Sequence, residues 1–300
     1  MNGAIERNKN GRIPWKNIWL IGAGLFAFVF IQQLTAFIAV SALDLPSMFP
    51  SDGGSLIIGT VCTYVLGAGA CALLLFAAER TETPKKSAGA ITCLEVFCIA
   101  AATVYLGNIA GVAVTTALGG SIDIIGDSLG GDAFLTFVVT VAVAPVVEEM
   151  IFRKMLIPRL LPFGERTAVI FSALAFALMH GNFLQFFYAL GFGVLCGYIF
   201  VRTGRAVYTV ALHIIINIFG GIIPSLLNRD GVRFYIYIAA VLAVAVVGTV
   251  LLCRRIPKLR LDAPEKGGVV WKSRNLLYLN PFSLAYLVIC AVFFVKMLLT

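Results

Sequence analysis

The chain has 300 residues, of which 60% are hydrophobic and 13% are charged, and its formal net charge is +8. Soluble domains are about 25% charged. With a mean hydropathy of +0.96, the composition excludes an ordinary soluble domain and predicts a protein of the lipid bilayer. The basic balance does not indicate nucleic-acid binding, because no basic stripe with interleaved aromatic residues is present, and we expect no nucleic-acid partner.

Apolar runs follow one another along the whole sequence. A helix needs about 20 apolar residues to cross the hydrocarbon core. We therefore predict an all-α, polytopic bundle of eight or nine transmembrane helices that forms a single membrane domain over residues 1–300. The expected runs are 18–43, 55–78, 91–118, 133–151, 167–180, 183–201, 207–227, 234–253 and 282–299.

Two of these runs need separate comment. The first is longer than the apolar segment of a signal peptide, which is roughly 7–15 residues, so we expect a retained helix. The fifth, 167–180, is short, and only Gly181 and Asn182 separate it from the sixth. The fifth and sixth runs form either two spans or a helical hairpin that turns inside the membrane.

The distribution of charge predicts the orientation. Four basic residues precede the first run, and four more lie in 152–166, which we interpret as a loop. The loops 44–54 and 119–132 carry acidic residues and no basic ones. This alternation follows the positive-inside rule, although Arg229 and Arg233 lie on the other side. We expect an integral protein of a bacterial plasma membrane with a cytoplasmic N-terminus, and we interpret 254–280 as a cytoplasmic linker.

Small residues also predict how the helices pack. Gly107 and Gly111 are four apart on the third run, and Gly193 and Gly197 are four apart on the sixth. This spacing permits close approach of helices in lipid. The seven cysteines contain no C-x-x-C pair, and we interpret them as core residues rather than as disulfide or zinc ligands.

Few ionisable side chains fall near these apolar runs, and such groups are functional candidates because an unpaired charge in a membrane is costly. Glu149 and Arg153 are four apart, so they share a helix face and are expected to pair. Glu148 is turned about 100° away and would remain available for a proton or a metal. The alternative is an ion pair at a helix end, with Glu148 merely solvated.

The two histidines of the chain, His180 and His213, both fall in apolar runs, and Asn217 shares a helix face with His213. Either histidine alone could be a hydrogen-bonding partner of a neighbouring helix. Together with Glu148, however, these groups supply a base, proton carriers or metal ligands, and an oxyanion donor. We predict that residues 141–221 form a catalytic core that activates water.

Taken in order, these residues resemble the three motifs of the CAAX-protease and bacteriocin-processing family (CPBP, also called Abi proteins). That family shows E-E-x-x-x-R, then F-x-x-x-H, then H-x-x-x-N on successive membrane helices. The matching residues here are Glu148, Glu149 and Arg153, then Phe176 and His180, then His213 and Asn217. The resemblance covers roughly 141–221, and the flanking helices contribute only hydrophobicity.

The resemblance implies an intramembrane endopeptidase with a hydrophobic or lipidated peptide or protein as substrate and membrane lipids as surroundings. Eukaryotic members cut the last three residues from prenylated CAAX proteins, and bacterial relatives are linked to bacteriocin immunity, peptide maturation and surface-protein display. By the same resemblance, Glu148 activates the water with His180 as its partner. His213 and Asn217 stabilise the oxyanion, and Arg153 holds Glu149 in place.

Two chemistries and two other functions remain open at this point. Glu148, His180 and His213 would complete a Zn²⁺ site with one position left for water, or the same residues would work without a metal. A non-catalytic immunity or scaffolding protein of the same fold would bind a peptide without cutting it. An ion or proton transporter would favour an inverted repeat, and the sequence contains no repeat.

Overall fold

The computed structural model describes residues 15–48, 51–83, 93–122, 133–227, 231–256, 260–262 and 273–299. Throughout these ranges the regular elements are helices. The polar N-terminal stretch before Trp15, the acidic residues of 123–132, Arg229, and residues 257–259 and 263–272 of the predicted linker 254–280 lie outside the described residues.

Eight helical segments within the described ranges are long and apolar enough to cross a membrane. They are Trp15–Ala42, Gly53–Phe76, Cys93–Ala117, Ala133–Phe163, Phe183–Thr203, Ala206–Leu226, Val232–Arg255 and Pro281–Leu299. Helices satisfy their own backbone hydrogen bonds, which lipid cannot do, so apolar runs of this length are stable in a bilayer as helices. The predicted all-α polytopic bundle is confirmed.

Several spans combine α-helical and π-helical segments (η1–η4 and η6; η5 is a 3₁₀ turn). The elements are α1 (Trp15–Phe37), η1 (Ile38–Ala42), α2 (Leu45–Met48), α3 (Asp52–Thr60), η2 (Val61–Gly67), α4 (Ala68–Phe76), α5 (Cys93–Ala117), α6 (Ala133–Phe137), η3 (Val138–Val143), α7 (Ala144–Glu149), η4 (Met150–Leu156), α8 (Ile157–Leu160), η5 (Leu161–Phe163), α9 (Glu165–Leu178), α10 (Phe183–Thr203), α11 (Ala206–Asn217), η6 (Ile218–Ile222), α12 (Ile223–Leu226), α13 (Val232–Arg255), α15 (Leu276–Leu279) and α16 (Pro281–Leu299).

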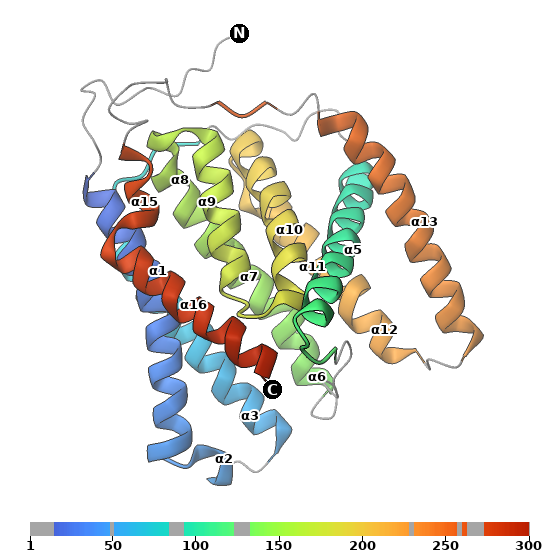
Figure 1. The fold of residues 1–300 in the computed structure, drawn as a ribbon, viewed down its shortest axis with the longest axis horizontal. Helices are drawn as coiled ribbons and strands as arrows, with labels where there is room; N and C mark the ends of the chain where they lie inside the picture. The colour runs from blue at the N-terminus through green and yellow to red at the C-terminus, as the bar shows by residue number, and fades with distance from the viewer. Residues whose placement is uncertain are drawn as a thin grey trace.

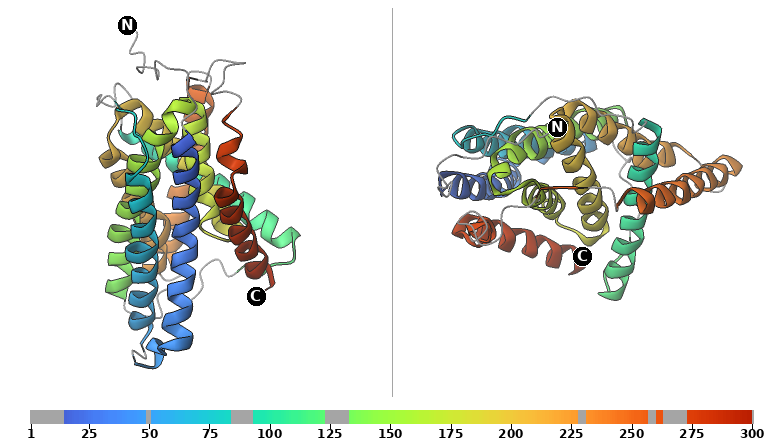
Figure 2. Two further views of the ribbon diagram at one scale, coloured as in Figure 1. Left: turned by 90° about the vertical axis from the view of Figure 1, so that its left-hand side faces the viewer. Right: turned by 90° about the horizontal axis from the view of Figure 1, so that it is seen from above.

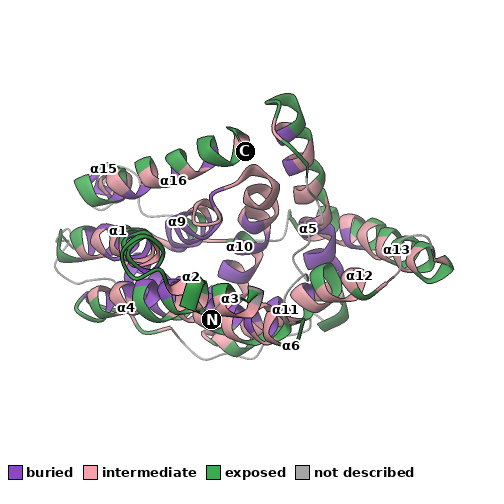
Figure 3. Ribbon diagram, turned by 90° about the horizontal axis from the view of Figure 1, so that it is seen from below, coloured by how far each residue is buried: buried purple, intermediate pink, exposed green. Residues whose placement is uncertain are grey.

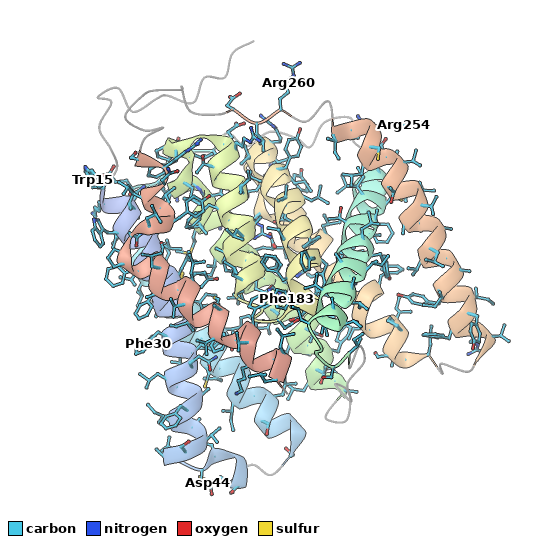
Figure 4. The ribbon with its side chains drawn as sticks, viewed as in Figure 1. Trp15, Phe30, Asp44, Phe183, Arg254 and Arg260 are labelled. Carbon is cyan, nitrogen blue, oxygen red and sulfur yellow. The ribbon has the colours of Figure 1, made fainter. Side chains whose placement is uncertain are left out.

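The fifth predicted run is the short helix α9, which forms a hairpin with α10 (Figure 1). Its 14 residues reach about 21 Å, less than the hydrocarbon core of about 30 Å. The turn contains Gly181, whose φ of 67° suits glycine, and Asn182, whose side chain accepts a hydrogen bond from the Gln185 N–H. Figure 4 places Phe183, the first residue of α10, midway between the ends of the molecule. Of the two alternatives, the structure has the hairpin.

The fourth span differs from its prediction. The sequence predicted a loop from residue 152, but the helical segment continues to Phe163 and buries both Arg153 and Arg159. The interpretation as a loop was wrong because each guanidinium finds a partner inside the protein. Arg153 pairs with Glu149, and Arg159 donates hydrogen bonds to the carbonyl oxygens of Leu75 and Met155.

The predicted glycine contacts are present where helices meet. A Cβ added at Gly107 on α5 would lie 2.4 Å from Cα of Tyr188 on α10, and one at Gly111 would lie 2.7 Å from the Phe183 carbonyl oxygen. Gly193 and Gly197 on α10 face α9, where an added Cβ would approach its nearest neighbour to 3.1 Å in each case. These four glycines let α10 pack closely against α5 on one side and α9 on the other.

The helix α13 lies at one edge of the molecule and packs against α5 (Figures 1 and 2). Its one buried residue is Gly248, where a Cβ would overlap the Cys98 carbonyl of α5. The rest of its surface is largely apolar and exposed or half-exposed, as Figure 3 shows from below. This surface is what a membrane helix presents to lipid.

Candidate active site

The two glutamates end α7, with the π-helical segments η3 before it and η4 after it. Only 6% of Glu148 and 0% of Glu149 is exposed. Single π-helical turns inside helices are frequent at functional sites. Burial of two neighbouring carboxylates requires compensating partners, and three other elements supply them.

Glu149 is held by the ion pair that the motif spacing predicts. Its Oε2 lies 3.1 Å from Nε of Arg153, and both side chains are fully buried. The guanidinium carbon of Arg153 lies 4.6 Å from the centre of the Phe176 ring. The positive charge is therefore compensated by a carboxylate on one side and by the negative face of an aromatic ring on the other.

His213 lies between the two glutamates. Its Nδ1 is 3.2 Å from Oε1 of Glu149, and its Nε2 is 3.8 Å from Oε2 of Glu148. The ring makes edge contacts with the rings of Phe176 and Phe192, at interplanar angles of 88° and 65°, which restrict its orientation. Because a carboxylate oxygen accepts hydrogen bonds, Nδ1 donates to Glu149, and Nε2 points toward Glu148.

His180 follows the last turn of α9, and its Nδ1 lies 2.9 Å from the Phe176 carbonyl oxygen. The backbone N–H of His180 bonds to Ala177 instead, so the Phe176 carbonyl lacks its usual helical partner. Because a carbonyl can only accept, Nδ1 carries the hydrogen, and in a neutral ring Nε2 then holds a lone pair. The F-x-x-x-H spacing thus fixes the tautomer of the histidine.

The structure gathers these groups around one point. Glu148, His213 and Arg153 all act electrostatically on His180, although they belong to other helices. The ring of Phe176 contacts both histidine rings, with centres 5.0 Å and 6.0 Å away. Residues from α7, η4 and α11 therefore meet beside Phe176 of α9 and His180 at the start of the turn to α10.

Asn217 has a partner that the sequence did not predict. Its Nδ2 donates to the carbonyl oxygen of Thr140 in η3 at 2.7 Å. In the π-helical turn the Ala144 N–H bonds to Val139, five residues earlier, so the corresponding partner of Thr140 would be residue 145. That residue is proline and has no N–H, and the Asn217 amide supplies the missing donor.

Tyr64 is a member of the site that lies outside the three motifs. Its hydroxyl donates to Oε1 of Glu148 at 2.9 Å, across 84 residues of sequence. Tyr64 belongs to η2 in the second span. The available signal was a phenol near the middle of an apolar run, but many membrane tyrosines are simply packing residues, and nothing in the run linked this one to Glu148.

We also compared this arrangement with a zinc site. Among the described residues, no three His, Cys, Asp or Glu side chains are arranged to hold a metal ion. Among these described residues, Glu148, His180 and His213 do not form such a three-ligand group, so we derive no step through a metal.

Comparisons with known proteins agree with the motifs. Residues 130–219 match the family model described as type II CAAX prenyl endopeptidase, Rce1-like. The protein CAAX prenyl protease 2 of Arabidopsis thaliana is 33% identical over 133 residues, which cover 37% of this chain and 40% of that protein. No solved structure matches the chain significantly.

The matched segment contains all seven motif residues, from Glu148 to Asn217, and the helical segments around them. The chain spans 40% of the length of the curated relative, so the relative's activity is not transferred here. The family resemblance predicted from the motifs is nevertheless confirmed: residues 130–219 of this membrane protein match the Rce1-like type II CAAX prenyl endopeptidase family.

Proposed function

We propose that the protein is an intramembrane endopeptidase that hydrolyses a peptide bond of a hydrophobic, lipidated substrate, with a prenylated CAAX protein as the first candidate. The observation that carries the proposal is the buried Glu148 carboxylate, which faces His213 within electrostatic reach of His180. The substrate class follows from the matched family and from the name of the plant relative.

Glu148 is the general base of this proposal. Its Oε1 accepts a hydrogen bond from the Tyr64 hydroxyl. Its Oε2 faces Nε2 of His213 at 3.8 Å, beyond hydrogen-bond distance. Oε2 takes a proton from the attacking water while the water oxygen bonds to the substrate carbonyl carbon. His180 assists through the lone pair on Nε2. When the C–N bond breaks, the proton on Glu148 passes to the leaving amine.

His213 and Asn217 stabilise the oxyanion that forms on the carbonyl oxygen. Nδ1 of His213 is bonded to Glu149, and its Nε2, on the side of Glu148, is the atom that donates to the oxyanion. Asn217 has two N–H groups; one is held by Thr140, and the second serves as the other donor. Donors fixed before the reaction stabilise developing charge without reorganising.

The proposed test is cleavage of a farnesylated peptide that ends in a CAAX sequence, followed by mass-spectrometric detection of the released tripeptide. Glu148→Gln keeps the size of the side chain and its bond from Tyr64 but removes the base. Loss of a general base lowers kcat by roughly 10²–10⁴-fold. The variant should elute like wild type in gel filtration, and wild-type turnover by Glu148→Gln would contradict the assignment.

Two further results would redirect the proposal. If the wild type binds the peptide but releases no tripeptide, the non-catalytic alternative replaces it. Elemental analysis of the active preparation tests the chemistry. About one zinc per chain, lost in both His180→Ala and His213→Ala, would mean that a metal activates the water. We expect activity without stoichiometric zinc.

A further inference from the structure

The Glu148 carboxylate is bound by a residue that the matched family segment does not include. Tyr64 lies on η2, whereas the match spans 130–219. Its hydroxyl hydrogen-bonds to Oε1 of Glu148 at 2.9 Å. The active-site carboxylate is thus held jointly by the matched domain and by the second membrane span.

The two oxygens of Glu148 have different surroundings. Oε1 accepts the phenol O–H, and Oε2 faces His213. A glutamate side chain has three rotatable bonds, and a hydrogen bond to one oxygen restricts which way the other oxygen points.

The position of Tyr64 is itself rigid. A Cβ added at Gly67, one turn along η2, would lie 2.8 Å from the Phe28 carbonyl oxygen of α1, so the two segments are in close contact. Both Phe28 and Gly67 are buried. The phenol therefore projects from a packed helix rather than from a loop, and its hydroxyl is held in a fixed position beside the carboxylate.

We propose that Tyr64 is a positioning residue of the endopeptidase: its hydroxyl holds Oε1 of Glu148 so that Oε2 points to the water. This inference rests on the function proposed above. It makes the second span a part of the catalytic machinery, beyond its role as a membrane anchor. It also predicts that residues 130–219 alone lack a group on which turnover depends.

Tyr64→Phe tests the inference because it removes one oxygen atom and keeps the ring. With the farnesylated CAAX peptide, kcat should fall roughly 10–100-fold, the range seen when a residue that orients a reacting ligand is lost. KM should stay near its wild-type value, because Tyr64 acts through Glu148.

Tyr105→Phe is the matched control. It removes a phenol oxygen from α5, where Tyr105 lies 3.5 Å from the Tyr237 hydroxyl and away from Glu148. We expect wild-type kcat and KM for this variant. Both variants are compared at equal amounts of monodisperse protein, which separates a catalytic defect from a folding defect.

The outcomes separate the two proposals. If wild type and Tyr105→Phe release the tripeptide and Tyr64→Phe does so with an unchanged kcat, the inference on Tyr64 is overturned and the proposed function stands. If Tyr64→Phe raises KM as much as it lowers kcat, or if Tyr105→Phe loses as much kcat as Tyr64→Phe, the role is merely structural and the inference is also overturned. If wild type itself releases no tripeptide, the proposed function fails and the inference with it.

Discussion

Each of the three motifs places two residues four positions apart, and the structure gives each spacing a different physical origin. Glu149 and Arg153 pair directly as charged side chains across one turn. In the second motif the contact joins the His180 ring to the backbone carbonyl of Phe176. In the third, the spacing keeps His213 and Asn217 on one face of α11, directed at different partners.

The buried pair of Glu149 and Arg153 leads to a stability prediction. Arg153→Leu leaves a carboxylate buried without its main counter-charge, which should destabilise the protein by about 3–5 kcal/mol. Thermal unfolding in detergent measures the effect. The matched control is Arg255→Leu, whose pair with Glu95 is partly exposed and should contribute about 0–1 kcal/mol. Equal losses for the two variants would contradict a supporting role for Arg153.

At the scale of the elements, π-helical turns are concentrated around the site. Tyr64 lies in η2, Thr140 in η3 and Arg153 in η4, and η6 begins directly after Asn217. Each such turn changes the angle between residues before and after it, so an ideal period of 3.6 residues does not predict which side chains meet. In η3, η4 and η6 a side chain from another helix donates a hydrogen bond to a backbone carbonyl oxygen.

The hydrogen bond from Asn217 to the Thr140 carbonyl in η3 leads to a stability prediction. Asn217→Ala should cost about 1–3 kcal/mol of stability, because the Thr140 carbonyl is left without a donor. In a Pro145→Ala background, residue 145 regains an N–H that can bond to Thr140. The same substitution should then cost clearly less. Thermal unfolding of the four proteins forms a double-mutant cycle, and strictly additive effects would contradict the proposed compensation.

At the scale of the whole molecule, the hairpin of α9 and α10 places the site at half depth. Figure 4 labels Arg254 and Arg260 at one end, Asp44 at the other, and Phe183 at the hairpin tip between them. If α9 were long enough to cross the membrane, His180 at its end would lie beyond the level of Glu148. Because α9 is short and the fourth span extends to Phe163, the histidine and the glutamate end at the same level.

Charge at the two ends leads to a prediction on orientation. The end with Arg254 and Arg260 should face the cytoplasm by the positive-inside rule. Two exposed cysteines lie on this side of the molecule. Cys93 is the first residue of α5, and Cys253 lies in the last turn of α13. In single-cysteine variants, a membrane-impermeant maleimide should label each of them in inside-out vesicles and not in intact cells.

The control for orientation is Ser47→Cys in a cysteine-free background, on the exposed α2 near Asp44 at the opposite end. This thiol should react in intact cells and be protected in inside-out vesicles. The reverse labelling pattern for Cys93, Cys253 and Ser47→Cys would place the N-terminus on the outer side and contradict the orientation.

The sequence by itself determined the features that depend on composition and on helix period. Apolar runs of about 20 residues require membrane helices, and the ordered motifs identified the family and brought Glu149 next to Arg153. Only the tertiary structure decided that the fifth and sixth runs form a hairpin and that Arg159 is buried. The same holds for two hydrogen bonds, from Tyr64 to Glu148 and from Asn217 to the Thr140 carbonyl. They join residues that are 84 and 77 positions apart in the sequence. The reason is physical: local periodicity fixes which residues share a helix face, whereas contacts between helices depend on turns and close packing that no single run encodes.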